Sequence, residues 1–396
     1  MFRLYDTRHR KVVSIEPARR GELRMYSCGP AVDRYAHAGN LRSYLLADLI
    51  RRTAQRHRLT VISCQNITDL RHPEIARHYE GALRADCAAL NIYPADSTPR
   101  ASESTAQMTG LIGRLIEAGH AYPSPDGSVF FDARSFPGYG EISGSRREEL
   151  PPEPGPGAAV DPRKRFHADW ALWQGAAAGG ELTWPAPWGT GFPGCDTQCS
   201  AMSLHELGEV IDIHTGSIDL RFPHHENERA QSDSVTGHEV VRHWVHGEHL
   251  LFDGRAMAGS TGNVVLVADV AARGLDPLAL RLALLEHSYR QPMNLTWETL
   301  AAAGRTLRRW RERVAEWANS PSKPMCAQYT ADITGAFDDD LDTPAALLAL
   351  RGLEEDDQIP PGSKFETFAG ADALLGLDLA RDVGRPPRPG PGGRAA

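Results

Sequence analysis

The chain has 396 residues, of which 41% are hydrophobic and 24% charged, and a formal net charge of −8 at pH 7. This length predicts two or three domains, and the acidic balance argues against a dedicated nucleic-acid binder, which usually carries a basic excess. Because no apolar run reaches the roughly 18–20 residues that span a membrane and the N-terminus lacks the apolar core of a signal peptide, we expect a cytoplasmic protein with no membrane partner.

The first 70 residues have the pattern of a βαβ unit. Strands are expected over residues 23–28 and 59–64, with a Gly-Pro turn after the first and a helix over 43–52 between them. A strand, a helix and a second strand in this order imply a parallel sheet, and ligands bind such sheets at the carboxyl ends of the strands. Cys28 lies at one of these ends.

The middle of the chain changes character twice. Residues 101–122 have a helical pattern, whereas residues 123–168 are rich in proline, glycine and charge. We expect the second stretch to be a loop-rich insertion that is not part of the sheet. Residues 210–214 then predict another short strand, which ends at a Thr-Gly-Ser turn.

From about residue 275 the pattern becomes helical. Thr296 is a candidate N-cap. The residues after it form one apolar stripe, which predicts a packing helix: Leu300, Ala303, Leu307, Trp310, Val314 and Trp317. A second helix is expected over 344–353, and the Pro/Gly-rich tail from residue 381 is expected to be disordered.

Residues 222–232, Phe-Pro-His-His-Glu-Asn-Glu-Arg-Ala-Gln-Ser, are the densest cluster of chemically active side chains. On a helix, His224 and Glu228 would share a face about 5–6 Å apart at Cβ, a spacing that suits two metal ligands. The alternative is a solvated helix start with satisfied histidines. Cys28 and Cys199 would complete a Cys₂HisGlu set of the kind that zinc accepts, although spacing alone does not assemble these four residues.

Residues 28–44 resemble the N-terminal signature of the class I cysteinyl-tRNA synthetases, with His37-Ala38-Gly39-Asn40 at the place of the family's HIGH-type motif. Further matches follow in the same order at residues 66–69, 170–173, 184–189, 199–202 and 212–228, and the resemblance covers roughly residues 2–380. It implies an α/β fold, a class I Rossmann-like catalytic domain with a connective insertion, followed by an α-helical domain. The implied parts are 1–110, the insertion 111–168, the second catalytic half 169–270 with the zinc site and the KMSKS-like loop, the helical domain 271–380, and the tail 381–396.

The resemblance also implies site residues. Zinc would be held by Cys28, Cys199, His224 and Glu228 and would bind the thiolate of substrate cysteine, which is activated by ATP with Mg²⁺. His37 and Asn40 would cradle the ATP phosphates near a helix N-terminus, and Gly216 and Asp219 would hold the ribose. The implied nucleotide-binding set is completed by Gly29, Gly39, Met257 and Ser260. The structural alternative for each of these residues is a turn or a cap.

The sequence leaves two candidates for the acceptor of the cysteinyl group. Part of the chain resembles the short mycothiol-pathway cysteine ligase, which acylates an amino sugar, glucosaminyl-inositol. This resemblance lies in residues 262–267, 276–290, 340–344 and 372–379 and in Pro73. Residues 224–232 are closer to the synthetases, which acylate tRNA. We therefore expect an ATP-dependent ligase acting on cysteine or a related amino acid with an amino-sugar or other amine acceptor. The alternatives are a truncated cysteine–tRNA ligase paralogue and a non-catalytic zinc-binding paralogue.

The chain departs from both relatives in the KMSKS-type loop at residues 254–263. Both lysines are replaced, by Ala256 and Gly259. Loss of one charge donor typically costs about 10²–10³ in rate. Arg255 is the candidate catalytic substitute, and the alternative is a solvated loop arginine.

Two further departures alter the expected pocket wall. The family's Trp-His-Ile-Glu-Cys reads Cys-Asp-Thr-Gln-Cys at residues 195–199, so Cys195 and Asp196 replace the tryptophan and histidine that line the pocket. Residues 31–34 also differ from the family pattern.

Overall fold

The computed structural model describes residues 1–70, 73–145, 161–176, 182–257 and 262–385. Its centre is a parallel sheet in the order β10-β9-β3-β4, formed by Val241–Gly247, Ile211–Ser217, Glu22–Ser27 and Thr60–Gln65. Helix α1 (Ala38–Arg56) connects β3 to β4 and packs on the sheet through its apolar face. The predicted βαβ unit and the parallel sheet of an α/β fold are confirmed.

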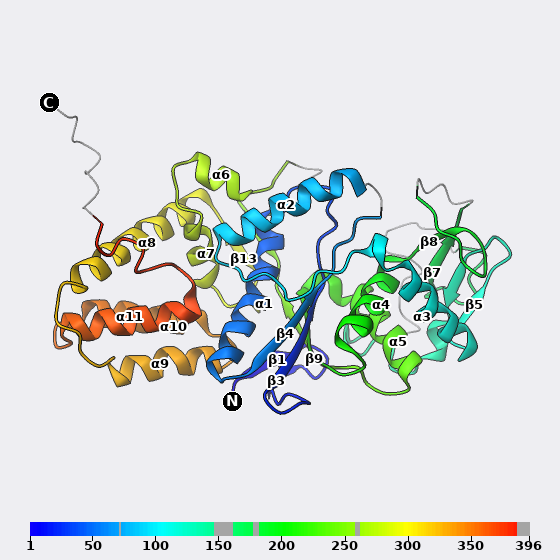
Figure 1. Cartoon of the computed structure of the whole chain (residues 1–396), viewed down its shortest axis with the longest axis horizontal. Coiled ribbons are helices and arrows are strands. Elements are labelled where there is room, and N and C mark those ends of the chain that lie inside the picture. The colour runs from blue at the N-terminus through cyan, green and yellow to red at the C-terminus, as the bar shows by residue number, and fades with distance from the viewer. Residues whose placement is uncertain (71–72, 146–160, 177–181, 258–261, 386–396) are drawn as a thin grey trace.

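A second sheet lies apart from the first (Figure 1) and is antiparallel, in the order β5-β6-β7-β8. It comprises Ala121–Pro123, Val129–Phe131, Trp170–Gly175 and Gly191–Pro193, and α3 (Thr105–Glu117) packs beside it. Residues 123–168, expected as a loop-rich insertion outside the parallel sheet, contribute the short strand β6 to this second sheet; three-residue strands are too short to show alternation in the sequence. This sheet runs across the boundary expected at residues 168 and 169.

The C-terminal part is helical. It contains α6 (Val267–Ala272), α7 (Leu278–Leu285), α8 (Trp297–Trp317), α9 (Ala327–Asp338), α10 (Thr343–Glu355) and α11 (Pro361–Leu375). The Thr296 hydroxyl caps α8 by accepting from the Thr299 amide at 3.1 Å, and the predicted apolar stripe is buried. The structure describes the expected tail only as far as residue 385.

A buried ionic contact joins the helical part to the sheet. Asp48 on α1 accepts from Arg52 on the same helix at 2.7 Å and from Arg281 on α7 at 2.6 Å. A buried carboxylate needs such partners, because an unpaired charge in the interior is strongly destabilising. In Figure 1 helices α8–α11 lie on one side of the parallel sheet, while α3 and the antiparallel sheet lie on the other. Within the described ranges, no helix is both long and apolar enough to cross a membrane.

Candidate active site and metal cluster

The four predicted metal ligands converge at the carboxyl end of β3. Cys28 directly follows this strand, Cys199 lies on α4 (Cys195–Leu207), and His224 and Glu228 lie one turn apart on α5 (His224–Thr236). Their donor atoms all lie within 4.8 Å of one another. Glu228 Oε1 is 3.3 Å from Cys28 Sγ and 3.1 Å from His224 Nε2. The fold therefore brings together a set that the sequence spacing alone left open.

This cluster carries more acidic groups than a buried site tolerates without a cation. Burial raises the pKa of Glu228 well above its usual value, and Glu228 Oε2 is buried without a hydrogen-bond partner among the described residues. A hydrogen bond from Cys28 and the nearby His224 lower the pKa of the Cys199 thiol to about 5. Burial opposes protonation of His224, but Cys199, Glu228 and Cys28 raise its pKa well above the usual value. Two sulfurs, a carboxylate and an imidazole fit a zinc ion.

A second donor set shares two of these residues. His214 on β9 and His225 on α5 place Nε2 atoms 3.4 and 3.3 Å from Cys28 Sγ, and 3.7 and 3.9 Å from Glu228 Oε1. Burial lowers the pKa of both histidines well below the usual value, which keeps them neutral and able to bind a metal. Because Cys28 and Glu228 belong to both sets, the sets are alternatives for a single tetrahedral ion.

His214 and His225 were missed as site residues, although both stand in the motif at 212–228. Their signal was weak, because strand and helix spacing places neither of them beside Cys28.

Hydrogen bonds and ring stacking hold these two histidines from behind. His225 Nδ1 lies 2.7 Å from His246 Nε2, and His246 Nδ1 lies 2.8 Å from the Thr7 hydroxyl. The Trp244 ring stacks on His214 with centroids 4.5 Å apart. A hydrogen bond to His246 thus holds the His225 ring, and stacking on Trp244 holds the His214 ring.

The HIGH-type residues form the N-terminal cap of α1. His37 Nδ1 accepts from the Gly39 amide at 3.1 Å and from the Asn40 amide at 3.4 Å, and Asn40 Oδ1 accepts from the His37 amide at 3.1 Å. Burial, with Arg34, lowers the pKa of His37, while the opposing charge of Asp219 acts on it from nearby. His37 therefore acts as the cap of α1, which was its structural alternative, and it stands at a helix N-terminus, the kind of position that suits an anion.

Two of the predicted nucleotide-binding glycines lie where a side chain has no room. A Cβ on Gly29 would lie 1.5 Å from the Asn66 carbonyl oxygen, and one on Gly216 would lie 2.9 Å from His225 Cε1. Both positions border the metal cluster, since Gly29 follows Cys28 and Gly216 contacts His225. Their glycines therefore keep the backbone close to neighbouring groups at the carboxyl ends of β3 and β9.

The KMSKS-like segment starts as a short exposed strand. Arg255 and Ala256 form β12, which pairs with β11 (Leu250–Phe252), and both side chains are exposed. The Asn263 side-chain amide donates to both of their carbonyl oxygens at 3.1 Å. Met257 is partly buried against the core, and Ser260 lies outside the described residues. The structure does not bring Arg255 into contact with the metal cluster.

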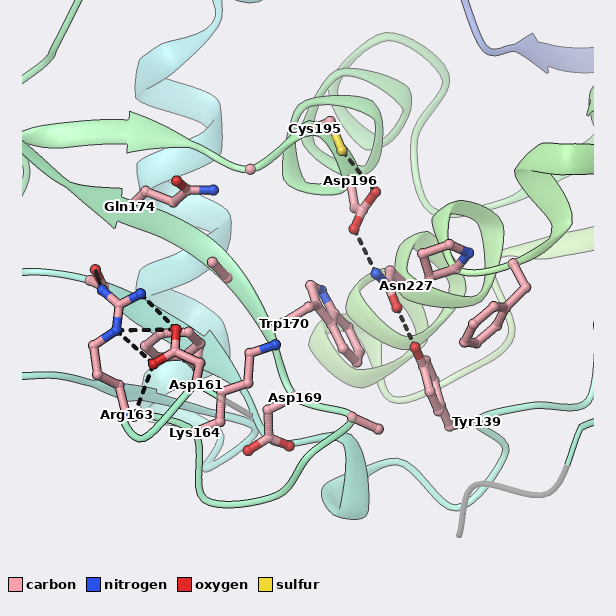
Figure 2. Close-up of a pocket in the computed structure, with 17 residues that line it drawn as sticks. Tyr139, Asp161, Arg163, Lys164, Asp169, Trp170, Gln174, Cys195, Asp196 and Asn227 are labelled. Carbon is pink, nitrogen blue, oxygen red and sulfur yellow. Dashed lines mark hydrogen bonds and ion pairs between the residues drawn. The ribbon is translucent and has the colours of Figure 1, made fainter. Parts of the chain in front are cut away.

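A cavity of about 390 Å³ separates the antiparallel sheet from α4 and α5. Figure 2 shows Arg163, Asp161 and Lys164 on one side of Trp170, and Asp196, Asn227 and Tyr139 on the other. Cys195 and Asp196, the two departures from the expected pocket wall, both line this space. The cavity therefore reaches the residues that lie next to the predicted zinc ligand His224.

Comparison with known proteins decides the family. Residues 14–305 match the model described as the tRNA synthetases class I (C) catalytic domain. The chain belongs to this family. A cysteine–tRNA ligase of Thermus thermophilus is 38% identical across 94% of this chain and 84% of its own length, and one of Opitutus terrae is 38% identical across 96% and 86%. The chain is thus an ATP-dependent ligase of the class I aminoacyl-tRNA synthetase type.

Solved class I synthetases share the fold. A Mycobacterium tuberculosis methionyl-tRNA synthetase bound by methionyl-adenylate has a TM-score of 0.61 at 14% identity, covering 91% of this chain and 90% of its own. The Agrobacterium radiobacter K84 agnB2 LeuRS, in a complex with tRNA and LeuAMS, has a TM-score of 0.63 at 12% identity, covering 92% and 84%. At these identities the likeness concerns the fold alone. The named sequence relatives are cysteine–tRNA ligases, so they favour the synthetase side of the resemblance over the amino-sugar ligase.

Proposed function

We propose that this chain activates cysteine with ATP and Mg²⁺ as cysteinyl-adenylate at a zinc site formed by Cys28, Cys199, His224 and Glu228, and passes the cysteinyl group to tRNA. The observation that carries the proposal is the convergence of these four donors, three of them buried, at the carboxyl end of β3. The names of the relatives support cysteine as the amino acid and tRNA as the acceptor. The relatives do not support the amino-sugar acceptor expected from the sequence; they support the alternative, a cysteine–tRNA ligase paralogue that acts on tRNA.

The donor set supports cysteine on chemical grounds. A bound zinc ion would supply a thiophilic Lewis acid that favours a deprotonated sulfur over a hydroxyl. Serine offers no equivalent ligand, so cysteine would be selected by an interaction that hydrophobic packing of a small side chain cannot match. The chain's own contribution is to hold Cys28 and Glu228 at 3.3 Å in a buried position.

The start of α1 supplies the anion site for ATP. The first amides of a helix lack partners within the helix and carry partial positive charge, which suits a phosphate. The Gly39 and Asn40 amides donate to His37 Nδ1, so a phosphate bound here would either accept from these amides in place of the ring or lie next to the ring. We assign His37 and Asn40 to the phosphates and Asp219, near His37, to the ribose. Arg255 is the candidate donor to the departing pyrophosphate.

Cysteine-dependent ATP–pyrophosphate exchange tests the activation step. We expect exchange with cysteine, much less with serine, and loss of exchange after zinc removal by a chelator with recovery on adding zinc. Zinc-loaded protein without any exchange would overturn the proposal and leave the non-catalytic paralogue. Serine at equal rate would leave adenylation intact but remove the role of the metal in selection.

Acceptor assays separate the remaining alternatives. The zinc-loaded protein is mixed with cysteine and ATP, and either tRNA or glucosaminyl-inositol is added. We expect acid-precipitable cysteinyl-tRNA and no cysteinyl amino sugar. The reverse result would restore the amino-sugar ligase, and a truncated relative that binds but does not charge tRNA would show exchange without either product.

A further inference from the structure

Asp196 occupies an unexpected place between two helices. It lies one turn before Cys199 on α4, and α4 lies beside α5, which carries His224 and Glu228. Its Oδ1 is 2.5 Å from His224 Nδ1, and its Oδ2 accepts from the Asn227 side-chain amide at 2.6 Å. Both carboxylate oxygens are therefore engaged by α5, and Asp196 is only 9% exposed.

These contacts settle which nitrogen of His224 faces the other donors. Nε2 lies 3.1 Å from Glu228 Oε1, within the cluster, while Nδ1 points to Asp196. A histidine that binds a metal through Nε2 carries its proton on Nδ1 and usually donates it to a carboxylate or carbonyl group. Such a partner fixes the ring orientation and makes the other nitrogen a better ligand. Asp196 stands where this partner is required.

Asp196 is itself held in place from the insertion. The Tyr139 hydroxyl donates to Asn227 Oδ1 at 2.5 Å, and the Tyr139 ring stacks on Trp170 with centroids 5.1 Å apart and an interplanar angle of 14°. Figure 2 shows this chain of contacts along one wall of the cavity, from Tyr139 through Asn227 to Asp196. The orientation of His224 thus depends on aromatic packing in the antiparallel sheet as well as on α5.

We propose that Asp196 is a positioning residue of the metal site, which accepts the Nδ1 proton of His224 and so holds Nε2 toward Cys28, Cys199 and Glu228. The inference rests on the proposed zinc site. It gives a role to a residue that the sequence comparison counted only as a loss of pocket wall. Because partners of metal ligands typically contribute 10–100-fold in affinity, removal of this carboxylate should weaken zinc binding by about that factor.

The experiment compares zinc affinity in three variants of the full chain, by competition with a chromophoric chelator. Asp196→Ala should bind zinc about 10–100-fold more weakly than the wild type. Asp196→Asn retains an oxygen that can accept from Nδ1, and should fall between the two. Asp161→Ala is the matched control, because this carboxylate lines the same cavity but pairs with Arg163 and lies outside every donor group that includes His224. It should retain wild-type affinity.

Cobalt substitution supplies a readout that a purely structural role would not move. The visible d–d bands report ligand geometry, and they should shift or weaken in Asp196→Ala and Asp196→Asn but not in Asp161→Ala. Thermal unfolding of the metal-free proteins shows whether each variant is folded. If Asp196→Ala does not fold, the zinc affinity and cobalt spectrum of Asp196→Asn provide the test.

The outcomes separate the inference from the proposed function. A wild-type protein that binds no zinc would sink the proposed site itself. Wild-type zinc binding with unchanged affinity and unchanged cobalt spectra in both Asp196 variants would overturn only the positioning role. An equal loss in Asp161→Ala would also overturn it, because the loss would then follow from any change in the cavity lining and not from the contact between Asp196 and His224.

Discussion

In the predicted metal site, side chains from the residue after β3, from α4 and from α5 face one another, whereas at the start of α1 the side chains of His37 and Asn40 bond to their own helix. The first arrangement buries two thiols and a carboxylate close together, which no element needs for its own folding. The second would exist in any well-capped helix. The cluster therefore carries a functional argument by geometry alone, while the nucleotide side depends on family membership.

Replacing a cluster cysteine should give the largest effect. We expect Cys199→Ser to lose zinc and cysteine-dependent exchange by more than about 100-fold, beyond what the loss of a ligand's own partner typically costs. Cys64→Ser is the control, because Cys64 is also buried but lies outside both donor sets. Zinc content and exchange rates provide the measurement.

His214→Ala decides between the two donor sets. If Cys28, Cys199, His224 and Glu228 hold the ion, His214→Ala should retain stoichiometric zinc while Cys199→Ser does not. The opposite pattern would assign the ion to Cys28, His214, His225 and Glu228, and would withdraw Cys199 and His224 as ligands.

The nucleotide side should respond to Arg255. If this guanidinium takes over from the missing lysines, Arg255→Ala should slow exchange by about 10²-fold, the effect of removing one preorganised charge donor. Arg305→Ala, an exposed arginine on α8, is the control. Ala256→Lys combined with Gly259→Lys should raise the rate if the native loop is short of positive charge. Equal rates for Arg255→Ala and Arg305→Ala would remove Arg255 from the reaction.

The contrast between the two regions also explains what could be predicted from sequence. The βαβ unit and the α8 stripe repeat one kind of signal over many residues, so periodicity was sufficient. Cys28 and Cys199 could be assigned to one metal site only through the resemblance, because they are distant in the chain. His214, His225 and the Asp196 contact depend on how α4, α5 and β9 meet, and no local pattern contains that geometry.

Asp196 illustrates the limit most clearly. In the comparison with the family motif, Asp196 only marks the loss of a histidine that lines the pocket. In the structure, it hydrogen-bonds to His224. The sequence did show that Asp196 and Cys199 are three residues apart on one helix, and that His224 and Asn227 are three residues apart on another. Each pair therefore lies on one face of its helix. Only the packing of the helices shows that the two sides meet.

The buried histidines behind the cluster predict acid sensitivity. Burial lowers the pKa of His246 to about 3, while an unfolded chain would protonate it near 6.5. Below pH 6.5 the unfolded state binds the extra proton, so the stability that His246 contributes is present above that pH and is lost as the pH falls toward 3. The expected slope is about 1.4 kcal/mol per pH unit for one such group.

Urea unfolding at several pH values between 7 and 4, with chelator present throughout, measures this slope. His246→Gln should have a pH dependence shallower by about 1.4 kcal/mol per unit, and His238→Gln, at an exposed position, should not differ from the wild type. Parallel curves for the wild type and His246→Gln would mean that His246 is not held neutral behind the cluster.

The smallest effect tests whether His37 is more than a cap. Its Nδ1 accepts two amides of α1, so His37→Ala should cost about 1 kcal/mol of stability, as loss of an N-cap does. His37→Asn keeps a cap acceptor but removes the imidazole, and should restore the stability measured by urea unfolding. Exchange distinguishes the roles, because a ring that contacts ATP leaves both variants slow, whereas a ring that only caps α1 lets His37→Asn turn over like the wild type. That last outcome would turn the nucleotide-side assignment of His37 into a structural one and leave the phosphates to the helix amides.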